Sequence, residues 1–255
     1  MQITPVMLLI ICPLTFLAGF IDSIAGGGGL ISLPSYLLIG LPSHAALGTN
    51  KLSSSFGTLV ATIRYAKNRQ ILYKSAIPAA LAAFAGSWLG ALLALSFEEK
   101  FLRIILVVIL PAIVIFFLAN KKFGNETRAA VLSDTRIIVL SVLTGLVIGT
   151  YDGFFGPGAG TFLILAFTGI IGFDLTTASG NAKVVNLASN ISALATFIFS
   201  GSVIYAIGIP AAVSGILGNW IGSGLAVKGG AKVIKPVFVC AAGLLFVKVL
   251  SDLLK

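Results

Sequence analysis

The stretch that decides the fold is Gly19-Phe-Ile-Asp-Ser-Ile-Ala-Gly-Gly-Gly-Gly29, because the chain repeats its pattern 130 residues later. The matching positions pair Gly19, Asp22, Gly26 and Gly28 with Gly149, Asp152, Gly156 and Gly158. Self-similarity at a fixed offset indicates a duplicated structural unit. The sequence therefore predicts two homologous halves, which we place at residues 1–125 and 126–255.

The repeat extends well beyond this stretch. After an insertion of two residues the offset becomes 132, and Lys51 then falls on Lys183. Further on, Gly86-Ser-Trp-Leu-Gly90 matches Gly218-Asn-Trp-Ile-Gly222, so the two tryptophans of the chain are repeat partners. Residues this rare do not recur in the same order by chance, and the duplication therefore determines the architecture.

The composition predicts an integral membrane protein. Hydrophobic residues make up 58% of the chain and charged residues 10%, whereas soluble domains carry roughly 25% charged residues. Several uncharged runs reach the ~20 residues that a spanning helix needs, and none alternates as a membrane β-strand would. We expect an all-α, multi-pass protein of the plasma (cell inner) membrane, with its first apolar segment retained as a span because no basic residue precedes it.

Five spans are expected in each half. Their ranges are 5–23, 27–41, 44–64, 75–95 and 102–120, then 136–152, 155–172, 175–199, 203–227 and 235–251. The second span of each half starts among glycines and is short, which predicts a broken or partly re-entrant helix. If these segments were fully re-entrant, each half would have four spans and the halves would be parallel.

The distribution of charge favours halves of opposite orientation. Arg64–Lys74 contains four basic residues, while the equivalent segment near Ser200–Tyr205 contains none. Conversely, Lys228–Lys235 is basic, while its counterpart Glu98–Arg103 has balanced charge. Because cytoplasmic loops are enriched in Lys and Arg, the halves are predicted to be inverted, with the central linker inside. The net charge of +9 is explained by these flanks, and we expect no nucleic-acid binding. Inverted repeats with interrupted helices are the plan of many secondary transporters.

The two glycine-rich turns are candidate substrate sites. Glycine lets backbone N–H groups approach a ligand closely, and a helix N-terminus carries partial positive charge, so such a turn suits an anion. The alternative is that glycine serves only close helix packing. The candidate residues in these turns are Gly26, Gly27, Gly28, Gly29, Gly156 and Gly158.

Two lysines lie early in apolar spans. A lysine at membrane depth costs ~2.5–3.5 kcal/mol on insertion scales, so Lys51 and Lys183 are expected to be paired or to line a polar cavity. The alternative is that each reaches a lipid head group. Asp22 and Asp152 are candidate salt-bridge partners or proton carriers. The nearby asparagines complete the predicted polar lining, and they are Asn50, Asn181, Asn186 and Asn190. The sequence contains neither a metal-ligand motif nor a nucleophile with a base, so we expect no metal, no cofactor and no enzymatic activity.

The quoted stretch, continued by Leu-Ile-Ser-Leu-Pro34 and by Ala46-Leu-Gly-Thr-Asn-Lys51, resembles the TauE/SafE sulfite exporter family. The second glycine-rich turn and Gly180-Asn-Ala-Lys183 fit the duplicated pattern of that family, although the second half lacks the run of four glycines. The resemblance implies a permease for sulfite, sulfonates or related sulfur-containing oxyanions. An anion channel and a membrane scaffold without transport are the alternatives. The expected partners are a small anion, the lipid bilayer and a coupling ion, either a proton or another ion. Assembly into a homo-oligomer is left open.

Overall fold

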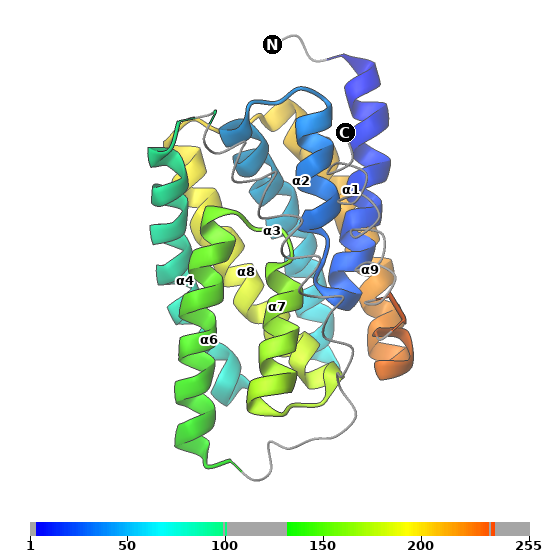
Figure 1. The fold of residues 1–255 in the computed structure, drawn as a ribbon. Helices are drawn as coiled ribbons and strands as arrows, with labels where there is room; N and C mark the ends of the chain where they lie inside the picture. Colours follow the sequence, from blue (N-terminus) through cyan, green and yellow to red (C-terminus); the bar gives the residue numbers. More distant parts are fainter. Residues whose placement is uncertain (1–3, 99, 101–131, 235, 238–255) are drawn as a thin grey trace, which may run out of the picture.

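A computed structural model describes residues 4–98, 100, 132–234 and 236–237, and its regular elements are all helical. In chain order they are α1 (Pro5–Ala25), α2 (Gly29–Leu38), α3 (Ser43–Lys67), α4 (Tyr73–Ser96), α6 (Asp134–Phe154), α7 (Ala159–Ala166), the π-helix η2 (Phe167–Ile171), α8 (Leu175–Phe199) and α9 (Tyr205–Gly229) (Figure 1). Among these residues, α1, α4, α6, α8 and α9 are long and apolar enough to cross a membrane. The predicted all-α, multi-pass membrane protein is confirmed. The expected fifth spans, 102–120 and 235–251, lie outside the described residues apart from positions 236 and 237.

Polar side chains begin several of the helices. Thr4 accepts a hydrogen bond from the Met7 N–H at 3.4 Å and is followed by Pro5, a residue suited to the first helical position. Asp174 accepts from the N–H groups of Thr176 and Thr177, both at 3.0 Å, at the start of α8. These bonds satisfy N–H groups that have no partner within the first turn of a helix.

The second segment of each half is short, as predicted. α2 has 10 residues, which at 1.5 Å per residue gives about 15 Å, half of the ~30 Å hydrocarbon layer. α7 has 8 residues and continues into the π-helical turn η2. Both segments start later than expected because Gly26, Gly156 and Gly158 adopt positive φ angles of 78°, 95° and 80°. Figure 1 shows α2 in the upper part of the bundle and α7 in the lower part.

The helices of the two halves interlock. α4 packs along α6 and α1 packs along α9, so the fourth helix of each half covers the first helix of the other. α3 and α8, the third helices, contact each other. Glycine permits the close approach: a Cβ on Gly153 would lie 2.0 Å from the Ser87 carbonyl oxygen, and one on Gly218 would lie 2.0 Å from that of Phe16. α1 and α6 run in opposite directions in the bundle (Figure 1). The limits of the two halves and their inverted orientation in the membrane stay predictions.

The outer surface of the bundle is apolar. Leu9, Leu81, Val147 and Phe199 expose 66–90% of their surface. Both Lys51 and Lys183, in contrast, are buried. Charged residues are almost never fully buried in soluble proteins unless they are paired. This distribution places the apolar surface in contact with lipid.

One end of the bundle gathers basic residues from both halves. The Arg64 guanidinium donates to the Trp220 carbonyl oxygen at 2.8 Å and stacks over the Trp220 ring, 3.8 Å from its centroid. This contact brings together the C-terminal parts of α3 and α9, where Lys67 and Lys228 lie. The charge pattern of the sequence predicts this arrangement, with both basic segments on one side of the membrane.

Candidate substrate site

The two helix breaks meet inside the bundle. The Gly26 carbonyl oxygen accepts a hydrogen bond from the Thr161 N–H at 3.1 Å, and the Thr161 hydroxyl donates to the Ala25 carbonyl oxygen at 3.0 Å. A Cβ on Gly26 would lie 2.3 Å from the carbonyl carbon of Gly160. For Gly26 the structure therefore shows the packing role of glycine, with the first break seated directly on the second.

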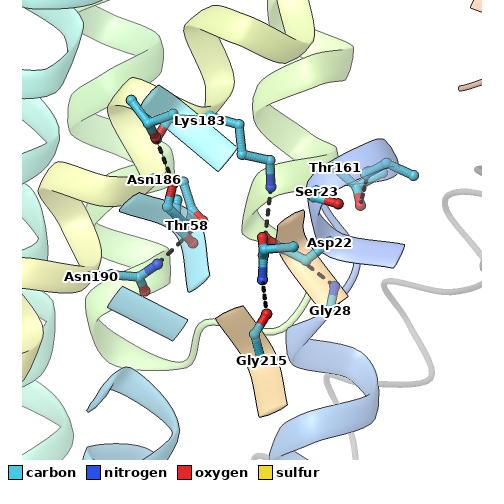
Figure 2. A network of polar contacts seen from close by, with 12 residues as sticks. Asp22, Ser23, Gly28, Thr58, Thr161, Lys183, Asn186, Asn190 and Gly215 are labelled. Carbon is cyan, nitrogen blue, oxygen red and sulfur yellow. Dashed lines mark hydrogen bonds and ion pairs between the residues drawn. The ribbon is translucent and has the colours of Figure 1, made fainter. Parts of the chain in front are cut away.

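Two ion pairs flank this junction. Lys51 Nζ donates to Asp152 Oδ1 at 2.8 Å. Lys183 Nζ donates to Asp22 Oδ2 at 2.6 Å (Figure 2). The two lysines are repeat partners and so are the two aspartates, and each lysine pairs with the aspartate of the other half. Lys51 and Lys183 are 2% and 0% exposed, so neither reaches a head group.

The Asp152 side of the junction is a closed polar network. Asp152 Oδ2 accepts from Asn186 Nδ2 at 3.3 Å and from the Ser189 hydroxyl. Asn190 Oδ1 accepts a second bond from Lys51 Nζ at 3.0 Å, and its Nδ2 donates to Asn186 Oδ1 at 3.2 Å. Gly156 lies beside the pair, since a Cβ there would be 3.5 Å from Lys51 Nζ. The Asp152 side chain is 4% exposed.

The Asp22 side is more open. Asp22 Oδ1 accepts from the Gly28 N–H at 3.3 Å, and its side chain is 16% exposed (Figure 2). A pocket lies next to this carboxylate. Its empty volume is about 310 Å³, which includes the open space at its mouth. Gly29, Thr58 and Asn219 are among the residues that line it. The two halves thus supply similar ion pairs but different surroundings.

The remaining predicted residues have other positions. Asn50 Oδ1 accepts from the Ser32 hydroxyl at 2.6 Å, which ties α3 to α2. Asn181 Oδ1 accepts from the Leu72 N–H at 2.8 Å just before α4, so Asn181 is not brought to either ion pair. The two remaining glycines belong to the helix starts: the Gly27 carbonyl oxygen accepts from Leu30 N–H at 3.1 Å, and Gly158 is the N-cap of α7.

Sequence reasoning missed three residues near the ion pairs: Thr58, Ser189 and Asn219. The spacing of Asn186, Ser189 and Asn190 on α8 is the signal for Ser189, because residues three and four apart share one face of a helix. Thr58 is the repeat equivalent of Asn190, and Asn219 that of Ser87, so the repeat itself points to both positions.

Each carboxylate is bound by one ammonium group and by neutral N–H or O–H donors. Charge-assisted hydrogen bonds of this kind are about twice as strong as neutral ones. Such donor sets can hold a carboxylate or an oxyanion inside the bundle. Among the described residues, no group of three or more His, Cys, Asp or Glu side chains is placed to hold a metal ion.

Comparison with known proteins gives a consistent result. The family model described as sulfite exporter TauE/SafE matches residues 11–249. A probable membrane transporter protein, ORF9, of Sinorhizobium sp. is 39% identical over 93% of this chain and 90% of its own length. The probable membrane transporter protein YfcA of Escherichia coli K12 is 37% identical over 98% of this chain and 92% of its own length. A probable membrane transporter protein of Haemophilus influenzae is 35% identical over 93% and 92%. No solved structure matches.

Proposed function

The chain belongs to the TauE/SafE sulfite exporter family of membrane transporters, and we propose that it is a secondary transporter of small anions. Sulfite, sulfonates and related sulfur-containing oxyanions are the proposed substrates, following the family description. The protein would carry them across the plasma membrane by alternating access, coupled to a proton or another ion.

The observation that carries this proposal is the way in which the protein binds its own carboxylates. Asp22 is held by the Lys183 ammonium and by the Gly28 N–H at the start of a broken helix. These are the kinds of donor that sequence reasoning assigns to an anionic substrate. A substrate oxyanion presents the same charge and the same acceptor atoms as a carboxylate. We therefore infer that the substrate takes the place of the aspartate on the lysine.

The energetics favour an exchange of partners over simple opening. Breaking a buried ion pair by removing one partner costs about 3–5 kcal/mol, because the other charge is left uncompensated. If an anion replaces the aspartate on Lys183 while a cation or a proton neutralises Asp22, no charge is left alone. The ion pairs also join the two halves, so changing their partners would loosen one half from the other.

The Asp22–Lys183 side is the better candidate for substrate entry. Its pocket is open, and the Asp22 side chain is 16% exposed against 4% for Asp152. On the other side, Asn186, Ser189 and Asn190 already fill the hydrogen-bonding positions around Asp152 and Lys51. That network is suited to holding the halves together while the substrate binds at the Asp22–Lys183 side.

Transport in proteoliposomes tests the proposal. Uptake of radiolabelled sulfite and sulfoacetate is measured for the wild type, Lys51→Ala and Lys183→Ala, with Lys74→Ala as the matched control. Lys74 pairs with Asp134 on the surface, where the two side chains are 53% and 70% exposed. We expect loss of uptake in the first two variants and wild-type uptake in the control. Unchanged uptake in both variants would remove the proposed site.

The same vesicles separate the carrier from its alternatives. A carrier gives saturable flux that follows an imposed ion gradient, whereas an anion channel gives large ohmic currents. A scaffold without transport gives no substrate-dependent flux and tolerates both lysine substitutions.

A further inference from the structure

We propose that the pocket beside Asp22 binds a monovalent alkali cation, represented by sodium. The cation pairs with Asp22 in place of Lys183, and the Lys183 ammonium is then free to bind the substrate. This inference rests on the proposed anion transport, and it adds the chemical identity of the coupling ion and the site where it binds.

The side chain of Asn219 has an unsatisfied oxygen. Asn219 is 3% exposed and lines the pocket, and its Oδ1 has no hydrogen-bond partner among the described residues. Its Nδ2 donates to the Gly215 carbonyl oxygen at 2.9 Å, which fixes the amide, since the reverse orientation would bring two oxygens together. A buried acceptor without a partner costs about 1–3 kcal/mol. A ligand that satisfies it must be a cation or a hydrogen-bond donor.

The two halves differ in the side chains that surround their ion pairs. The repeat equivalents of Asn186, Ser189 and Asn190 are smaller: Ser54, Gly57 and Thr58. The equivalent of Asn219 is Ser87, whose hydroxyl donates to the Ser189 carbonyl oxygen at 2.7 Å. The side chains that close the network around Asp152 are thus replaced, beside Asp22, by smaller residues and a pocket.

The residues that line the pocket suit a hard cation. The pocket is lined by Asp22 together with Ser54, Thr58 and Asn219, residues whose side chains all carry oxygen atoms. Oxygen ligands select hard cations, while nitrogen and sulfur ligands, which transition metals prefer, are absent from this lining. One carboxylate balances one positive charge, which favours a monovalent over a divalent ion. In transporters with broken helices, alkali cations bind near the interrupted segments, and Asp22 lies in the last turn of α1.

Coupling follows from charge balance. In the structure Asp22 neutralises Lys183. When sodium occupies the pocket it competes for Asp22, and the freed ammonium of Lys183 then attracts the anion. With a monoanion such as hydrogensulfite, the loaded site contains two positive and two negative charges, so its net charge is unchanged. Sodium and substrate should therefore each tighten the binding of the other.

Thermal unfolding of the purified full-length protein tests the site without any substrate. Sodium chloride is titrated against choline chloride at constant ionic strength, for the wild type, Thr58→Val, Asn219→Leu and the control Ser87→Ala. We expect a saturable rise in the unfolding temperature of the wild type and the control. The apparent sodium affinity should fall about tenfold or more in Thr58→Val and in Asn219→Leu, because each loses an oxygen ligand to a charged group.

Thr58→Val is nearly isosteric and keeps the test meaningful if Asn219→Leu does not fold. Equal stabilisation by sodium and choline would overturn the proposal, as would wild-type sodium affinity in Thr58→Val. Repeating the titration with sulfite separates the two proposals. Sodium binding without any sulfite effect would leave the cation site standing and refute anion transport. Sulfite binding that is independent of sodium would refute the release of Lys183 by the cation and leave anion binding standing.

Discussion

The Lys51–Asp152 pair offers a quantitative test of how the two halves are joined. Lys51→Met removes the ammonium and leaves Asp152 with two neutral donors, Asn186 and Ser189. Asp152→Asn leaves the ammonium of Lys51 with neutral acceptors, among them Asn190 Oδ1. Each single change leaves one buried charge uncompensated, so each should lower the free energy of unfolding by about 3–5 kcal/mol.

The double variant Lys51→Met/Asp152→Asn should behave differently. It removes both charges, and replacing a whole buried pair is often neutral or stabilising. Additive effects would total roughly 6–10 kcal/mol, whereas we expect the double variant to be more stable than either single variant. At about 2–4 °C per kcal/mol for a chain of this length, the single variants should unfold roughly 6–20 °C below the wild type.

The assay is thermal unfolding in detergent, with loss of the monodisperse peak in size-exclusion chromatography as the readout. The surface pair Lys74–Asp134 provides the control, because exposed pairs contribute about 0–1 kcal/mol. The reasoning is refuted if the Lys51 and Asp152 single variants unfold at the wild-type temperature. It is also refuted if the double variant loses the sum of the two single losses.

Three further predictions concern packing, orientation and the candidate site. Asn181→Leu should lower stability by about 1–3 kcal/mol, because a backbone N–H loses its acceptor, and should leave the substrate affinity in vesicles unchanged; altered affinity would place Asn181 in the site. Gly153→Val should yield no monodisperse protein, since even a Cβ there would lie 2.0 Å from the Ser87 carbonyl oxygen; a normal yield would contradict the packing. In a cysteine-free background, Asn68→Cys should react with an impermeant maleimide only from the cytoplasm and Ser202→Cys only from outside; reaction of both from one side would disprove the orientation.

Much of the architecture can be predicted from the sequence because the duplication is visible in it. Glycine and aspartate recur at fixed offsets, and the short second segments follow from the placement of glycine. Uncharged runs of sufficient length predict the spans of α1, α4, α6, α8 and α9. α3 carries Lys51 and several hydroxyl side chains, and its burial is explained by its contacts with α8 and α9.

The partners of the polar residues could not be predicted in the same way. The sequence places Lys51 and Asp22 in one half, and nothing in their spacing says that Lys51 pairs instead with Asp152. Asn181 has the same residue type as Asn186. Its side-chain oxygen, however, accepts a hydrogen bond from the Leu72 N–H at the start of α4. Tertiary neighbours decide these roles, and a periodic pattern identifies only a buried polar position.

Each ion pair joins a residue of one half to a residue of the other, and this has a consequence for biosynthesis. Asp22 and Lys51 are made and inserted long before Lys183 and Asp152 leave the ribosome, and neither has its ion-pair partner within its own half. During this interval the newly made segment must keep two charges in contact with water or with the insertion machinery. Both ion pairs can therefore form only after translation has passed Lys183 in α8.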